Sequence, residues 1–131
     1  VGNIWYTGSR SSCSDLRSKK DIAIMPYVLK KLEQLNGVYY HWRVDEFPEN
    51  DFENTKQIGV IAQELEQVYP ELVITGSDGY KTVDYPKLTA VLLEAVKNLS
   101  AKNEQQQNEI TELQLLKSEV EALKVMLAGG E

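Results

Sequence analysis

Residues 86–127 read PKLTAVLLEAVKNLSAKNEQQQNEITELQLLKSEVEALKVML, and this stretch decides the fold. After Pro86 the chain has no further Pro, it has no Gly before Gly129, and Leu, Glu, Gln, Lys and Ala dominate. The composition predicts one long helix over 86–127. Such a helix would extend about 60 Å at 1.5 Å per residue, far beyond what the preceding residues can cover. It therefore needs partner helices.

The long helix carries a seam whose members alternate at spacings of four and three, which is typical of a coiled coil. The first part of the seam comprises Leu92, Val96, Leu99, Asn103, Gln106, Ile110 and Leu113. A stammer near 113–116, a shift of three residues, then collects Leu116, Val120, Leu123 and Leu127. Asn103 and Gln106 lower the stability of the seam but can fix its register and the number of chains. The alternative is a long helix packed on its own domain.

The residues before the long helix predict a small head of helices and hairpin strands. Pro26 suits a first helical position, Gly37 and Pro70 stand where helices end, and Asp78-Gly79 is a strong hairpin signal. The expected elements are helices at about 26–36 and 58–69, a strand at 38–43, a solvated loop at 44–56, and two short strands at 72–75 and 80–85. The fold class expected is α+β, a helix-and-hairpin head followed by a long C-terminal helix.

Composition excludes several classes of protein. The 131 residues amount to one domain, and 20 acidic against 14 basic residues give a formal charge of −6, which disfavours general nucleic-acid binding. No apolar run approaches the ~20 residues that span a bilayer, and the N-terminus lacks a secretory signal, so we expect a soluble chain without a membrane partner. One cysteine, Cys13, and one histidine, His41, exclude an internal disulfide and a zinc site. No cofactor is expected.

A cluster of hydroxyls and lysines lies near the N-terminus, where residues 11–22 read SSCSDLRSKKDI. Local spacing favours a structural role, with Ser14 or Ser18 as a helix cap and the lysines on a solvated face. A serine–lysine pair becomes reactive only if the lysine is neutral. That requires desolvation or nearby positive charge to bring a lysine pKa from ~10.4 toward ~7–8. Lys20, adjacent to Lys19, could supply part of that charge.

Four segments, in order along the chain, resemble one known family. They are SDLRSKKDI at 14–22, LKKLEQLNGVYYHW at 29–42, QIGVIAQELEQVYPELV at 57–73 and YKTVDYPKLTAVLLEAVKNL at 80–99. Together they closely resemble the C-terminal intramolecular chaperone auto-processing domain, found in endosialidase tailspikes, other phage tail fibres, bacterial surface proteins and myelin regulatory factor. The resemblance covers residues 14–100, and a coiled-coil end is also typical of that family.

The resemblance implies a domain plan and a set of partners. Under this plan 1–13 end an upstream client, 14–100 form the chaperone domain, 86–127 form the trimerisation helix, and 128–131 are a flexible tail. The long helices would associate as a parallel three-stranded coiled coil. The implied partners are two further copies and the upstream segment of the same polypeptide. The implied location is a phage tail fibre or a bacterial surface or secreted protein.

The resemblance also implies self-cleavage by a single-turnover serine endopeptidase. In the family a serine that opens the motif pairs with a lysine five residues later, and the peptide bond before the serine breaks. Ser14 matches the serine and Lys19 matches the lysine, so the implied scissile bond joins Cys13 to Ser14. The implied function is to trimerise and fold an upstream fibre and then to detach from it.

Several other residues have weaker or open roles. Asp15 and Arg17 match the motif, and Arg17 could hold the turn or lower the lysine pKa, whereas Lys20 and Ser18 stand at the wrong spacing. His41 reads as a packed or hydrogen-bonded residue rather than a base. Gln63 and Glu64 could contact another chain or the client, or could simply be helix-surface residues. Two rival functions remain open: a non-cleaving trimerisation and capping module at a fibre end, and a ligand-binding adhesin tip.

Overall fold

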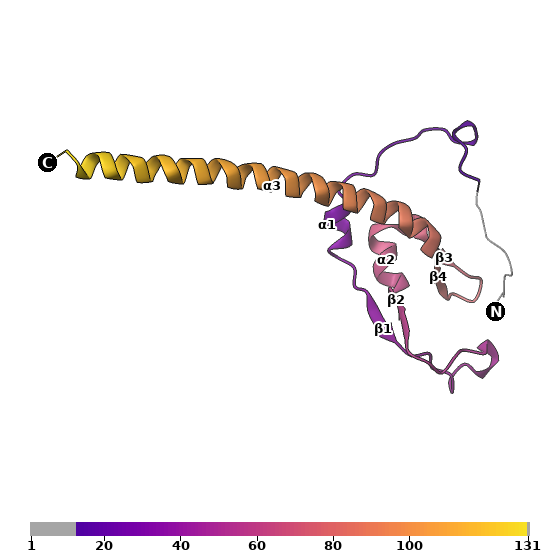
Figure 1. Cartoon of the computed structure of the whole chain (residues 1–131). Helices are drawn as coiled ribbons and strands as arrows, with labels where there is room; N and C mark the ends of the chain where they lie inside the picture. The colour runs from indigo at the N-terminus through magenta and orange to yellow at the C-terminus, as the bar shows by residue number, and fades with distance from the viewer. Residues whose placement is uncertain (1–12, 131) are drawn as a thin grey trace. The chain divides into compact units, whose positions relative to one another are not determined.

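The computed structural model describes residues 13–130, so the expected client tail lies almost entirely outside the described residues. The fold is α+β, as predicted, with two small antiparallel sheets and one long C-terminal helix (Figure 1). The chain divides into two compact units, one up to Lys87 and one from Leu88 onward. The elements are η1 (Leu16–Ser18), α1 (Val28–Leu32), β1 (Val38–Tyr40), η2 (Pro48–Asn50), β2 (Gln57–Gly59), α2 (Ala62–Val68), η3 (Pro70–Leu72), β3 (Val73–Thr75), β4 (Lys81–Val83) and α3 (Tyr85–Ala128).

The predicted hairpin is confirmed as β3 and β4, which pair antiparallel with Ile74 opposite Thr82, although both strands are shorter than expected because Leu72 belongs to η3 and Tyr85 begins α3. Gly79 adopts a φ of +84°, a conformation that glycine enters without steric cost, and the Asp78 carboxylate accepts a hydrogen bond from the Tyr80 amide. Lys81 Nζ then joins the hairpin to α2 through an ion pair of 2.9 Å with Glu66. The turn chemistry in the sequence therefore sets this hairpin.

The prediction of a helix over 58–69 is wrong for its first four residues. Residues Gln57–Gly59 form β2, which pairs antiparallel with β1 and sets Ile58 opposite Tyr39. The helix begins only at Ala62, and its Leu65 is fully buried. Because Ile58, Ile61 and Leu65 fit the helical spacing by chance, periodicity could not separate the strand from the helix.

The expected helix at 26–36 is shorter than predicted, because α1 covers only Val28–Leu32. Pro26 is not the first residue of α1, because Tyr27, with a left-handed φ of 56°, stands between Pro26 and Val28. Turns follow the helix at its C-terminal end, where the Leu35 amide donates to the Leu32 carbonyl, so Gly37 does not end the helix directly. The strand expected over 38–43 likewise shortens to Val38–Tyr40.

The core of the head is small. Its buried side chains come from α1, α2 and the η3 turn, and they are Val28, Leu65, Tyr69 and Leu72. Tyr85 closes the β1–β2 sheet from one side, because its hydroxyl accepts a hydrogen bond of 3.1 Å from the Val60 amide. A core of this size gives limited stability by itself.

The long helix is confirmed, and α3 extends from Tyr85 to Ala128. The Asp84 carboxylate accepts a hydrogen bond from the Lys87 amide at its first turn, which satisfies one of the free amides of a helix start. The seam residues of α3 are exposed in the single chain. A membrane-crossing helix is not found within residues 13–130, where each helix is too short or too polar for that.

Candidate functional site

A three-residue turn, η1, organises the cluster of hydroxyls and lysines. Asp15 caps it by accepting a hydrogen bond of 2.8 Å from the Arg17 amide, and the Arg17 guanidinium returns to the same carboxylate with contacts of 3.0 and 2.8 Å. This two-point contact is the strong, planar form of an arginine–carboxylate pair. Arg17 therefore holds the turn, one of the two roles left open for it. The expected caps, Ser14 and Ser18, are not the capping residues.

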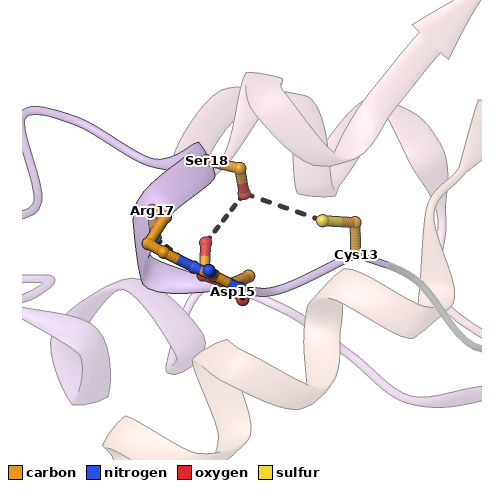
Figure 2. A network of polar contacts seen from close by, with 4 residues as sticks. All are labelled: Cys13, Asp15, Arg17 and Ser18. Carbon is orange, nitrogen blue, oxygen red and sulfur yellow. Dashed lines mark hydrogen bonds and ion pairs between the residues drawn. The ribbon is translucent and has the colours of Figure 1, made fainter.

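The same contacts fix the charges of the turn. The side chain and then the amide of Arg17 hold the pKa of Asp15 below its ordinary value of 3.8, and Asp15 raises the pKa of Arg17 in return. Ser18 Oγ donates a hydrogen bond of 2.7 Å to the Asp15 carbonyl, which closes the turn from its other end (Figure 2). The turn is thus held by hydrogen bonds within four residues rather than by a buried core.

The turn brings Ser14 and Lys19 together. Lys19 Nζ donates a hydrogen bond of 2.6 Å to Ser14 Oγ, and the Lys19 amide donates to the Leu16 carbonyl at the end of η1. Both residues are exposed in the single chain. Lys20 forms no hydrogen bond or ion pair with any residue in 13–130. The Ser14 hydroxyl therefore has the Lys19 amine within hydrogen-bond distance, which is the geometry needed to pass a proton between the two groups.

Cys13, which precedes Ser14, also contacts the turn. Its Sγ lies 3.6 Å from Ser18 Oγ (Figure 2), and the Asp15 backbone amide, followed by the Ser18 hydroxyl, lowers the pKa of the thiol. The side chain is exposed. The residues on both sides of the Cys13–Ser14 bond therefore contact the turn, Cys13 through Ser18 of η1 and Ser14 through Lys19, the residue that caps η1.

The remaining candidates lie elsewhere in the head. His41 is exposed rather than packed, and it lines a cavity of about 280 Å³ whose other walls are mainly aromatic, with Trp42 and Phe52 stacked at 4.1 Å. Among the described residues no serine or cysteine lines this cavity, so none of them offers His41 a hydroxyl or thiol nucleophile there. Glu64 is half-buried on α2 and its Oε2 has no hydrogen-bond partner within the described chain, which leaves its role open.

Comparison with known proteins places the head in a family. Residues 14–74 match the family model described as chaperone of endosialidase, which is also named as a peptidase family. The chain is 39% identical over 93 residues to the long tail fiber protein Gp37 of Enterobacteria phage K3 and, equally, to that of Enterobacteria phage T2. Each match covers 68% of this chain but only 7% of the fibre protein. Residues 14–74 of this chain belong to the chaperone-of-endosialidase family, as the sequence resemblance predicts, and three of the four resembling segments lie within that match.

Proposed function

We propose that this chain is a trimerising intramolecular chaperone of a fibre protein, and that it releases itself by hydrolysing the bond between Cys13 and Ser14. The observation that carries the proposal is the contact of 2.6 Å between Lys19 Nζ and Ser14 Oγ. Ser14 is the residue immediately after the peptide bond that would be cleaved. Two findings support it. The family match begins at Ser14, and the relatives at 39% identity are tail fibre proteins.

The proposed reaction begins when neutral Lys19 takes the proton of the Ser14 hydroxyl. Ser14 Oγ then attacks the carbonyl carbon of Cys13, and the tetrahedral intermediate expels the α-amine of Ser14, which receives the proton from Lys19. The product of this step is an ester between the Cys13 carbonyl and Ser14 Oγ. Water hydrolyses the ester and yields a Cys13 carboxylate and a free Ser14 hydroxyl. Because nucleophile and target belong to adjacent residues, proximity replaces a substrate pocket and each chain reacts once.

Assembly supplies the gate in this proposal. A lysine loses its charge readily only where water is excluded, and Ser14 and Lys19 are exposed in the single chain. Packing of neighbouring copies around η1 would remove that water, so cleavage would follow correct assembly. The Asp15–Arg17 pair keeps the hydroxyl and the amine in register until then.

The α3 seam is the proposed trimerisation surface. Its apolar members include Leu99, Ile110 and Leu123, which are exposed in the single chain although a residue of this kind gains roughly 1.5–3 kcal/mol on full burial. Three parallel copies would bury the whole row, with Asn103 and Gln106 setting register and copy number. A clamp at one end lowers the entropic cost of aligning three chains of a slow-folding fibre. Its later removal would leave a fibre that persists because it unfolds slowly.

Mass spectrometry of the purified full chain tests the cleavage. We expect a fragment that begins at Ser14 in the wild type, and only intact chain in Ser14→Ala and in Lys19→Ala. Lys30→Ala is the control, since Lys30 is an exposed lysine whose side chain makes no hydrogen bond or ion pair within residues 13–130, and it should still be cleaved. An intact wild-type mass after prolonged incubation of the assembled protein would contradict autoproteolysis and leave the non-cleaving capping module.

A further inference from the structure

A short apolar segment between η1 and α1 is exposed at three of its four side chains, and only Met25, its last residue, is half-buried. Ile22, Ala23, Ile24 and Met25, here named the apolar arm, belong to no helix or strand (Figure 1) and lie between two residues with a left-handed φ, Asp21 at 54° and Tyr27 at 56°. Ile22 and Ile24 are 65% and 79% exposed. Residues 20–26 make no backbone hydrogen bond to any residue in 13–130.

These properties are those of an unpaired β-strand. Ile22 and Ile24 alternate at the period of a strand, so both would lie on one face of a sheet, and their free amides and carbonyls can pair with a sheet edge. Extended segments of this kind bind by adding a strand to an exposed edge. The left-handed residues at both ends limit the segment to about one short strand.

The β1–β2 sheet offers such an edge. It has two strands within the described residues, so the second edge of β1 is unpaired there. Tyr39 and Ile58 stand opposite each other on its outer face and are 69% and 75% exposed. A two-stranded sheet is marginal by itself, and a third strand would both satisfy the edge and extend the apolar face.

Charge favours one direction of the match, because the acids of the loop after β1 outnumber Arg43 and Lys56 at its two ends, and it points to a second copy of the chain. Lys19 and Lys20 precede the apolar arm, and the loop that follows β1 carries unbalanced negative charge. The acids of that loop are Asp45, Glu46, Glu49, Asp51 and Glu53, of which Glu46 is paired with Arg43. In an antiparallel addition the lysine end of the arm lies beside the end of β1 that enters this loop. Each chain thus carries both the apolar arm and a β1 edge that fits it. Because the arm does not pair with β1 of its own chain, β1 of a second copy is the matching partner.

We propose that the apolar arm of one copy adds as a third, antiparallel strand to the free edge of β1 in a second copy. Ile22 then lies opposite Tyr39, and Ile24 lies opposite Gly37. No atom lies within 4 Å of the position that a Cβ would take at Gly37, so there is room beside it for the Ile24 side chain. Lys20 faces the acidic loop of the receiving copy. The inference rests on the proposed homotrimer and adds to it a means of regulation. Lys19 lies three residues before Ile22, so docking of the arm would also fix the position of Lys19. Because the arm can dock only on a neighbour whose head has folded, cleavage would wait for that folding.

Disulfide formation between copies tests the proposal. One copy carries Ile22→Cys and the other carries Tyr39→Cys and a mass tag, both with Cys13→Ser to remove the sole native cysteine and Ser14→Ala to prevent cleavage. After coexpression and mild oxidation, we expect a covalent pair of one tagged and one untagged chain. The matched control replaces Tyr39→Cys by Ile74→Cys, an exposed apolar position on the other two-stranded sheet, and should give at least tenfold less product.

Sedimentation of the same samples separates the possible failures. A trimer without the specific disulfide overturns strand docking and leaves the proposed function intact. Covalent pairs in an assembly other than a trimer support docking and overturn the trimer, whereas a lone protomer overturns both. Equal yields with Ile74→Cys also overturn docking. As a second measurement, Lys20→Glu should reduce the disulfide yield and Asp45→Lys in the receiving copy should restore it, and failure of either change contradicts the charge match.

Discussion

Lys19 Nζ donates a hydrogen bond of 2.6 Å to Ser14 Oγ across a turn of three residues. A contact between residues five positions apart requires the chain to reverse between them, and the Asp15–Arg17 pair holds that reversal. The pair is exposed, so its two-point geometry matters more than its strength. The proposed chemistry therefore depends on a turn that has no core behind it.

Arg17→Ala should slow the proposed cleavage by about 10²-fold, because the amine and the hydroxyl lose their alignment. Arg17→Lys should recover only part of the rate, since an ammonium cannot bind both carboxylate oxygens in one plane. The rate is measured as appearance of the fragment that begins at Ser14. Arg43→Ala removes the second exposed arginine–carboxylate pair found within residues 13–130 and is the control. Equal rates for Arg17→Ala and wild type would show that the turn does not position the reacting groups.

Hydroxylamine should accelerate cleavage if an ester at Ser14 Oγ is the intermediate, because hydroxylamine attacks esters faster than water does. The peptide that ends at Cys13 should then carry a hydroxamate in place of its carboxylate, which its mass reveals. Ser14→Ala should remain intact in the same reagent. A hydroxamate in Ser14→Ala, or a carboxylate alone in the wild type at high reagent concentration, would argue against the ester.

The turn should weaken in acid. Arg17 holds the pKa of Asp15 below 3.8, so the ionised carboxylate is favoured in the folded chain. Its contribution to stability is complete above the unfolded pKa of ~3.9 and is lost as pH falls through the lower folded pKa. A carboxyl NMR titration of the Ser14→Ala chain should give an Asp15 midpoint below 3.8, and Arg17→Ala should raise it. An unchanged midpoint in Arg17→Ala would contradict this cause.

The sequence predicts the elements whose signals are local. The α3 helix follows from a composition free of Pro and Gly, and the β3–β4 hairpin follows from Asp78-Gly79. The contact between Ser14 and Lys19 was expected only through the family resemblance, because two residues five apart are not neighbours in a helix or a strand. Asp15 is a favoured capping residue, so its role could have been found from residue type alone.

Elements that depend on distant contacts escaped prediction. The β2 strand exists because β1 pairs with it and Tyr85 covers Gly59, and neither partner is close in sequence. Tyr27 adopts a left-handed φ that a bulky residue rarely enters, so no local rule could place it before α1. The helical spacing of Ile58 therefore predicts a helix at a position where contacts with distant residues instead form a strand.

Gly59→Ala should lower the free energy of unfolding by about 1–3 kcal/mol, because the site is already filled. A Cβ there would lie 2.5 Å from the Tyr85 hydroxyl oxygen, so Tyr85 would have to give up its bond to the Val60 amide. Denaturant unfolding measures the loss. Gly37→Ala is the control, since nothing lies within 4 Å of its Cβ position, and it should cost nothing. Equal losses at the two glycines would refute the close approach.

Ile110→Asp should dissociate the proposed trimer, because it places three charges together in a seam that assembly would close to water. Burying such a charge costs several kcal/mol unless it is paired. Thr111→Asp, one residue outside the seam, is the matched control and should sediment as the wild type does. If cleavage depends on assembly, Ile110→Asp should also remain uncut at Cys13–Ser14. A variant that is monomeric and still cleaves would separate the two events, and the gate would then have to reside in the head of the single chain.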